Sequence, residues 1–180
     1  RLVWAIDRTL QLGLTDLMLH AGFLPEIDAP ERKEMLDTLA KAGQIASEKG
    51  VTLAFETGQE TATLLRRTLD DLKSPNIKVN FDPANMLLYD MGNPIEAVEI
   101  LGPDIRSVHV KDANRPTTAG QWGSEVPLGE GQVNIPLFIK TLKRVGYAGP
   151  LIIEREVGDQ RSRFNDVAKG LAFLKECLAS

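Results

Sequence analysis

Four apolar segments of this chain each carry, near the C-terminal end, one side chain that can bind a metal ion. They are residues 51–58 with Glu56, residues 77–82 with Asp82, residues 105–110 with His109, and residues 151–154 with Glu154. Short apolar runs of this length, bounded by turn residues, predict buried β-strands. If the strands are parallel, their carboxyl ends lie at one edge of a sheet, so the four side chains are predicted to converge there.

Segments with helical apolar spacing alternate with these strands. A further strand is predicted at residues 15–20, and helices are predicted at residues 1–13, 30–50, 62–72, 94–101, 133–145 and 161–178. This alternation predicts one parallel sheet in an α/β fold, with the strands in sequential order. Active residues at the carboxyl ends of such strands are typical of a (β/α)₈, or TIM, barrel.

A closed TIM barrel has eight βα units and usually needs about 200 residues or more, whereas five units are predicted here. We therefore expect residues 1–180 to form a single TIM-barrel-type domain made of the C-terminal five units (strands four to eight), with three units preceding Arg1. The strand at residues 15–20 would then be an open sheet edge. Such an edge favours cover by a missing segment or by a second chain, as in a homo-oligomer.

Composition excludes several classes of partner. The net charge is −4 and no basic block is present, which argues against a nucleic-acid backbone as ligand. No apolar run approaches the ~18 residues of a membrane span, and no signal peptide opens the chain. The single cysteine, Cys177, excludes an internal disulfide framework and suits a reducing, cytoplasmic location.

The four strand-end residues are predicted to share one face of the sheet. Side chains alternate between the faces of a strand, so Glu56 lies with Ala54, and the same register turns Asp82, His109 and Glu154 inward. A lone carboxylate after a strand is usually a helix cap or a surface charge, but four consecutive strands that end this way argue for a common site. Three carboxylates and one imidazole suit Mn²⁺, Mg²⁺ or Co²⁺ better than a structural zinc site.

One long segment interrupts the alternation. Residues 113–132 contain Pro116, Gly120, Gly123, Pro127, Gly129 and Gly131. Long loops in compact domains are usually functional. We expect residues 113–126 to cross the C-terminal face of the barrel, with Trp122 or Arg115 reaching toward the pocket.

The sequence also resembles a known family. Phe-Glu-Thr-Gly (55–58), Asp-Pro-Ala-Asn (82–85), His-Val-Lys-Asp-Ala-Asn-Arg (109–115), Pro-Leu-Gly-Glu-Gly (127–131) and Ile-Ile-Glu (152–154) are similar to motifs of the xylose isomerase-like barrel superfamily. Within it, the chain most resembles the sugar-phosphate isomerase/epimerase group, which includes ketose 3-epimerases and hydroxypyruvate isomerases. The resemblance covers essentially the whole chain.

The resemblance implies a ligand set and a catalytic pair. In ketose 3-epimerases the strand-end residues hold one divalent ion, which assigns Glu56, Asp82, His109 and Glu154 as ligands. The two glutamates also act as acid and base there, so Glu56 and Glu154 are the expected catalytic residues.

Substrate-binding positions of the group fall on further residues. Arg115 matches an arginine six residues after the histidine, whereas Asn85 stands where those enzymes have a histidine. His20, in His-Ala-Gly, resembles a His-x-Gly of several members and is a lesser pocket candidate. Lys111 shares the inward face of His109 and could meet a carboxylate, phosphate or hydroxyl, or be a solvated strand-end lysine.

This ligand set predicts an isomerase or epimerase that acts on a small sugar or hydroxy-carbonyl compound. A divalent metal would stabilise an enediolate as a Lewis acid while the two glutamates move the proton. Loss of water at the same site would make the protein an inosose-type dehydratase, and a non-catalytic sugar-binding or scaffold protein is the alternative of a different class. The zinc endonuclease of the superfamily needs more histidines than the two present, and an Asp-x-His where this chain has Gly-Ser-Glu (123–125).

Overall fold

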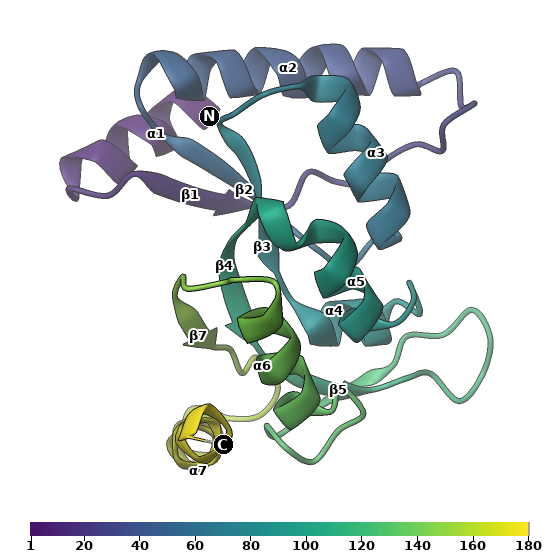
Figure 1. Ribbon diagram of the computed structural model, residues 1–180, viewed down its shortest axis with the longest axis vertical. Helices are drawn as coiled ribbons and strands as arrows, with labels where there is room; N and C mark the ends of the chain where they lie inside the picture. The colour runs from purple at the N-terminus through teal and green to yellow at the C-terminus, as the bar shows by residue number, and fades with distance from the viewer. Residues whose placement is uncertain (180) are drawn as a thin grey trace.

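The computed structural model describes residues 1–179, and its centre is a parallel sheet of five strands. The strands are β1 (Asp16–Leu19), β2 (Thr52–Glu56), β3 (Ile77–Phe81), β4 (Ile105–Val110) and β7 (Leu151–Ile153). They pair in the order β1-β2-β3-β4-β7, and every pairing is parallel (Figure 1). The predicted sequential parallel sheet is therefore confirmed.

Helices precede, connect and follow the strands and cover one face of the sheet (Figure 1). They are α1 (Leu2–Gln11), α2 (Arg32–Glu48), α3 (Ala62–Leu72), α5 (Pro94–Leu101), α6 (Ile135–Arg144) and α7 (Gln160–Ala179), all within a few residues of their predicted positions. Side chains at alternate strand positions fill the core beneath them. Phe55, Phe81 and Val108 are fully buried there, and the Phe81 ring stacks on Phe138 of α6 with 5.8 Å between ring centroids.

Polar side chains fix where the helices begin. The Thr61 hydroxyl accepts a hydrogen bond from the backbone N–H of Leu64 at 3.2 Å, which confirms the predicted N-cap of α3. Asn93 and Asn134 cap α5 and α6 in the same way, and each of these helices has a proline in its first turn. The sequence therefore sets the start of α3, α5 and α6 locally.

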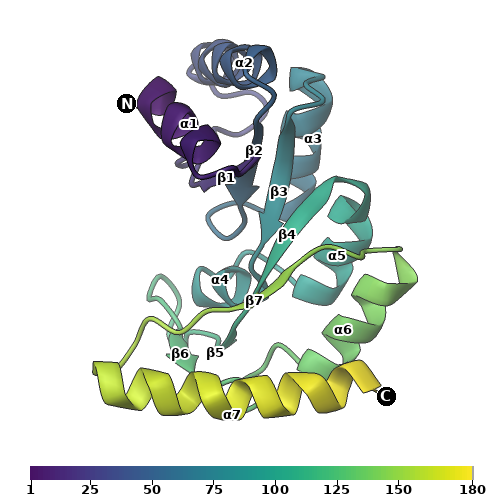
Figure 2. The ribbon, with the colours of Figure 1, turned by 90° about the vertical axis from the view of Figure 1, so that its left-hand side faces the viewer.

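The other face of the sheet is concave (Figure 2). An ion pair crosses it from the guanidinium of Arg106 on β4 to the carboxylate of Asp16 on β1, with Nε–Oδ1 at 2.6 Å. Because β2 and β3 separate these two strands, such a short distance requires the sheet to curve. A hollow on this face is lined by residues that include Met18, His109 and Ile152. This arrangement is a curved parallel half-barrel.

A β-hairpin and a short helix were not predicted from the sequence. Residues 113–126, expected to be a loop, contain strands β5 (Asp112–Asn114) and β6 (Ser124–Val126), which form an antiparallel hairpin. A short helix, α4 (Pro83–Leu88), follows β3 directly. Elements of three to six residues are too short to show a periodic pattern, which explains why both were missed.

Of the helices within residues 1–179, none combines the length and the apolar character that crossing a bilayer requires.

Candidate metal centre

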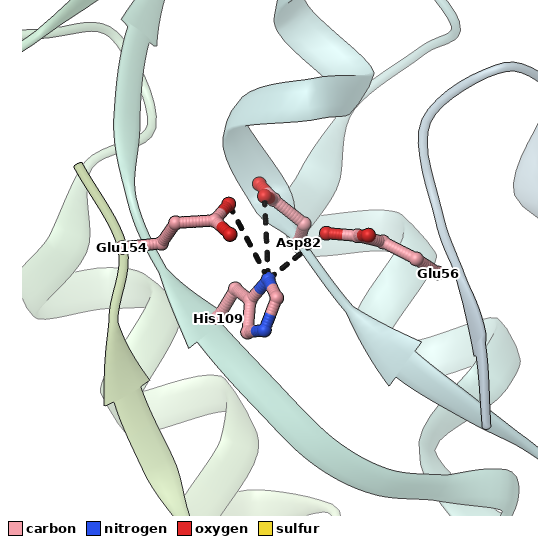
Figure 3. Close-up of side chains that lie close together, drawn as sticks. All are labelled: Glu56, Asp82, His109 and Glu154. Carbon is pink, nitrogen blue, oxygen red and sulfur yellow. Dashed lines mark hydrogen bonds and ion pairs between the residues drawn. The ribbon is translucent and has the colours of Figure 1, made fainter. Parts of the chain in front are cut away.

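The four strand-end side chains converge at the carboxyl edge of the sheet (Figure 3). Glu56 ends β2, Asp82 follows β3, His109 lies on β4, and Glu154 follows β7. One ligand-competent atom from each residue lies within 4.8 Å of the others. Because adjacent parallel strands end side by side, four residues that are far apart in sequence come together as the strand-end pattern predicts.

The imidazole of His109 occupies the centre of the cluster. Its Nδ1 atom is 2.9 Å from Oε1 of Glu56, 3.4 Å from Oε2 of Glu154, and 3.9 Å from Oδ2 of Asp82. Asp82, Glu56 and His109 are buried, whereas the Glu154 side chain is partly exposed. The cluster is therefore dry on one side and accessible on the other.

Asp82 joins the site to the fold. Its Oδ1 atom accepts hydrogen bonds from the backbone N–H groups of Ala84 at 2.8 Å and Asn85 at 3.0 Å, which caps α4. Its Oδ2 atom is buried and accepts no hydrogen bond from the described residues, although it faces the cluster. A buried carboxylate oxygen without a donor is costly, and a cation bound by the cluster would satisfy it. The donor set fits a hard divalent ion such as Mg²⁺ or Mn²⁺.

The electrostatics of the cluster are set by burial and by two cations. Burial raises the pKa of Asp82 to about 7, although the positive charge of Lys111 opposes the rise. Burial lowers the pKa of His109, but the hydrogen bonds that its ring N–H donates to the carboxylates of Glu154 and Glu56 outweigh this effect and bring the pKa to about 10. The hydrogen bond from His109 lowers the pKa of Glu154 to about 2. The carboxylates thus coexist because an imidazolium and an ammonium lie among them.

Lys111 is buried beside the cluster, with 1% of the residue exposed. Its Nζ atom donates to Oε2 of Glu154 at 3.0 Å and to Oε2 of Glu156, and it lies 3.7 Å from Oδ2 of Asp82. It also approaches Oδ1 of Asn85 at 3.5 Å. Lys111 is therefore not a solvated lysine at a strand end, and that alternative interpretation of the sequence is wrong.

Two other expected pocket residues also lie against the cluster. Nε2 of His20 is 3.0 Å from Oε2 of Glu56, and the His20 side chain is otherwise more than half exposed. Nδ2 of Asn85 is 3.5 Å from Oε1 of Glu56. Both side chains are placed where a molecule bound at the cluster would meet them.

Arg115 and Trp122 do not reach the four-residue cluster in this structure. Arg115 instead pairs with the carboxylate of Asp90 and donates to the carbonyl of Gly92. Trp122 is 74% exposed and packs edge-on against the ring of Tyr89, 5.3 Å between centroids. Each side chain thus contacts residues 89–92, just after α4, and the expectation that one of them reaches the pocket stays a prediction.

Three acidic residues near the site were missed. Glu156 lies two residues after Glu154, so the period of two that placed Glu154 inward could have found it. The side chain of Glu125 on β6 is buried and pairs with Arg155, a contact with no local signal in the sequence. Glu60 lies on the loop that follows Glu56, and burial raises its pKa to about 7 while backbone N–H groups of that loop lower it.

Comparison with known proteins agrees with the family resemblance of the sequence motifs. Residues 1–177 match the model of the xylose isomerase-like TIM barrel family. A solved structure, the xylose isomerase domain protein from Planctomyces limnophilus, superposes with a TM-score of 0.94 at 38% identity, over 98% of this chain and 64% of that one.

Two curated relatives are sugar epimerases by name. The ketose 3-epimerase of Arthrobacter globiformis is 26% identical over 83% of this chain and 52% of its own length. The L-ribulose-5-phosphate 3-epimerase UlaE of Escherichia coli (strain ATCC 8739 / DSM 1576 / NBRC 3972 / NCIMB 8545 / WDCM 00012 / Crooks) is 29% identical over 96% of this chain and 58% of its own length. The chain thus spans little more than half of these relatives. On the family match and the fold together, the chain belongs to the xylose isomerase-like TIM barrel family.

Proposed function

We propose that this protein is a divalent-metal-dependent isomerase or epimerase of a small sugar or related hydroxy-carbonyl compound. The observation that carries the proposal is the convergence of Glu56, Asp82, His109 and Glu154, with the Oδ2 atom of Asp82 facing the cluster and accepting no hydrogen bond from the described residues. The sugar epimerases among the relatives support the reaction class.

The four clustered residues would hold one Mn²⁺, Mg²⁺ or Co²⁺ ion. When bound, such an ion supplies Lewis-acid polarisation of a substrate carbonyl. The histidine would serve as a ligand in its neutral form, so binding requires His109 to release the proton that Glu56 and Glu154 stabilise. Metal affinity should therefore rise with pH.

Glu56 and Glu154 are the proposed proton-transfer pair. They come from β2 and from the residue after β7, on two sides of His109, so they flank any molecule bound between them (Figure 3). One glutamate removes the proton on the carbon next to the carbonyl, and the other returns a proton to the same or to the neighbouring carbon. Return to the same carbon from the opposite face gives epimerisation, whereas return to the neighbouring carbon gives isomerisation.

His20, Asn85 and Lys111 are proposed to contact substrate oxygens, because all three lie against the cluster. Arg115 remains a substrate-binding candidate by its motif position. To act so, its guanidinium would have to leave Asp90.

The proposed active form is a closed barrel, in which three further βα units cover the concave face. Apolar side chains on that face support this: Met18 is 42% exposed and Ile152 is 47% exposed. They lie on β1 and β7, the two outer strands of the sheet, where added strands would pair.

The test is a set of four variants in the full-length protein, assayed on a panel of ketoses and hydroxypyruvate. Glu56→Gln and Glu154→Gln keep a ligand oxygen but remove the base, so turnover should fall about 10²–10⁴-fold while metal still binds. Asp82→Asn and His109→Ala should instead weaken metal binding, with activity partly recovered at high Mn²⁺.

Product analysis distinguishes the outcomes. A dehydrated product would identify a dehydratase at the same site. Near-normal turnover of both glutamine variants would refute the two-glutamate mechanism. Bound sugar without any turnover would favour a binding protein.

A further inference from the structure

A second polar group lies directly beside the proposed metal ligands. It consists of Lys111, which follows β4, Glu156 on the loop after β7, and Glu125 on β6. We infer that Lys111 and Glu156, held in place by Glu125, form a subsite for an uncharged hydroxyl of the substrate and disfavour a phosphate or carboxylate there. This inference rests on the proposed function and names the kind of substrate group that the site accepts.

The ammonium of Lys111 connects the subsite to the cluster. Its Nζ atom contacts carboxylate oxygens of both Glu154, at 3.0 Å, and Glu156. Lys111 is almost completely buried, whereas the Glu156 side chain is 66% exposed. The pair is therefore fixed at its inner end and open to an incoming molecule at its outer end.

The charges around Lys111 argue against an anionic group. Besides Glu154 and Glu156, the ammonium faces Oδ2 of Asp82 at 3.7 Å and Oε2 of Glu125 at 3.9 Å. If Asp82 and Glu154 bind a metal ion, Glu156 still neutralises the ammonium, and the carboxylate of Glu125 remains 3.9 Å from it. A phosphate placed on Lys111 would meet the carboxylate of Glu156 at close range and be repelled. A hydroxyl can accept from the ammonium and donate to that carboxylate.

Glu125 determines where Glu156 lies. Its side chain is 4% exposed, and its Oε1 atom accepts from the guanidinium of Arg155 and from the backbone N–H of Glu156 at 3.0 Å. Arg155 is held in turn by Asp166 of α7, with Nε–Oδ2 at 3.0 Å. The loop after β7 is thus tied to both the hairpin and α7, which keeps the Glu156 carboxylate against Lys111.

The arginines of the two loops at this rim are also paired with carboxylates. TIM barrels often bind phosphate at the loops after the last two strands, with a helix N-terminus nearby. Here the loop after β7 continues to Asp159, whose Oδ1 atom already accepts from the backbone N–H of Ser162 at 2.8 Å at the start of α7. Among the described residues of these two loops, Arg115 and Arg155 are each paired with a carboxylate.

The experiment compares L-ribulose with L-ribulose 5-phosphate in the full-length enzyme with Mn²⁺. We expect kcat/KM to be at least about tenfold higher for the free ketose, which corresponds to a free-energy difference of about 1.4 kcal/mol. Glu156→Gln should raise the relative kcat/KM for the phosphate about tenfold. Glu99→Gln is the matched control, because Glu99 pairs with Arg144 on the helical side and should leave the ratio unchanged.

Glu125 is tested as a positioning residue. Glu125→Ala should raise KM for L-ribulose and reduce the preference for the free ketose, with kcat and Mn²⁺ affinity retained. Glu125→Gln, which keeps an acceptor for the backbone N–H of Glu156, should restore most of the preference. A purely structural role would lower thermal stability in both variants without changing the preference.

Binding of ribitol and ribitol 5-phosphate, measured by calorimetry, separates this inference from the proposed function. If the enzyme turns over the phosphate at least as well as the free ketose, the subsite inference is wrong and the proposed function stands. If neither these two ketoses nor any compound of the ketose and hydroxypyruvate panel reacts, the proposed function fails. Tighter binding of ribitol than of its phosphate would then still support the subsite, and the reverse order would overturn it.

Discussion

The buried carboxyl of Glu60 predicts a pH-dependent stability that a single substitution should remove. Glu60 lies between β2 and α3 and is 7% exposed. Burial raises its pKa from 4.5 to about 7, against the opposing effect of hydrogen bonds from the backbone N–H groups of Gly58 and Gln59. At about 1.4 kcal/mol per pH unit, this difference corresponds to about 3 kcal/mol of unfolding free energy.

The sign follows from the direction of the shift. Because the pKa is higher in the folded state, the folded protein binds this proton more tightly than the unfolded chain. The free energy of unfolding therefore falls as pH rises from about 4.5 to about 7. Above that window Glu60 is a buried charge, and below it both states are protonated. Glu60→Gln keeps the shape without the charge, so it should be nearly neutral at pH 4.5 and stabilise by up to about 3 kcal/mol at pH 8.

Urea unfolding of wild type and Glu60→Gln at pH 4.5, 6 and 8, without added metal, measures this difference. Subtracting wild type from variant at each pH cancels the titration of all other groups. Glu34→Gln, the same chemical change on the exposed face of α2, is the control and should show no trend. A difference for Glu60→Gln that stays constant with pH, or a less stable variant at pH 8, would refute the reasoning.

Two further predictions concern the metal centre and the loop that follows the hairpin. Mn²⁺ at 100 times its Kd should stabilise the protein by about 2.7 kcal/mol and raise Tm by several degrees in calorimetry. The Asp82→Asn variant keeps the cap of α4 but loses a charged ligand, so Mn²⁺ should change its Tm little. Asp112→Ala should lower the unfolding free energy by about 3 kcal/mol or more in urea, because the buried carboxylate accepts from the backbone N–H groups of Gly129, Gly131 and Val133. Asp112→Asn should cost less, and equal losses in both variants would contradict this account.

Much of the fold could be predicted from the sequence because its signals are local. Apolar runs, helical spacing and caps such as Thr61 fix where elements begin and end. Once parallel neighbours are assumed, the period of two places Glu56 and His109 on one face. The short helix α4 and the β5–β6 hairpin carry no such period, and their positions depend on contacts such as the hydrogen bond from Gly123 N–H to the carbonyl of Leu88.

The surroundings of the site depend on tertiary contacts that spacing cannot reveal. The motif position of Arg115 suggested a pocket residue, but the turn after α4 places Asp90 closer to it. Lys111 was ambiguous in sequence because its three nearest carboxylates come from two segments that are distant from it in the chain, Asp82 after β3 and Glu154 and Glu156 after β7. The cytoplasmic location and a homo-oligomeric state remain predictions.

The carboxylate of Asp82 belongs both to the proposed metal site and to the cap of α4, so one side chain links the site to the fold. Its Oδ1 atom caps α4, a helix that begins with Pro83, so the carboxylate is held by backbone groups before any ligand arrives. That restraint leaves Oδ2 facing His109 and Lys111 without a hydrogen bond of its own. The His109 imidazolium and the Lys111 ammonium now balance the three carboxylates, and a divalent cation bound there would take over most of that role. Metal binding should then loosen the hold of Lys111 on Glu154 and direct its ammonium toward Glu156, which is where the proposed hydroxyl subsite lies.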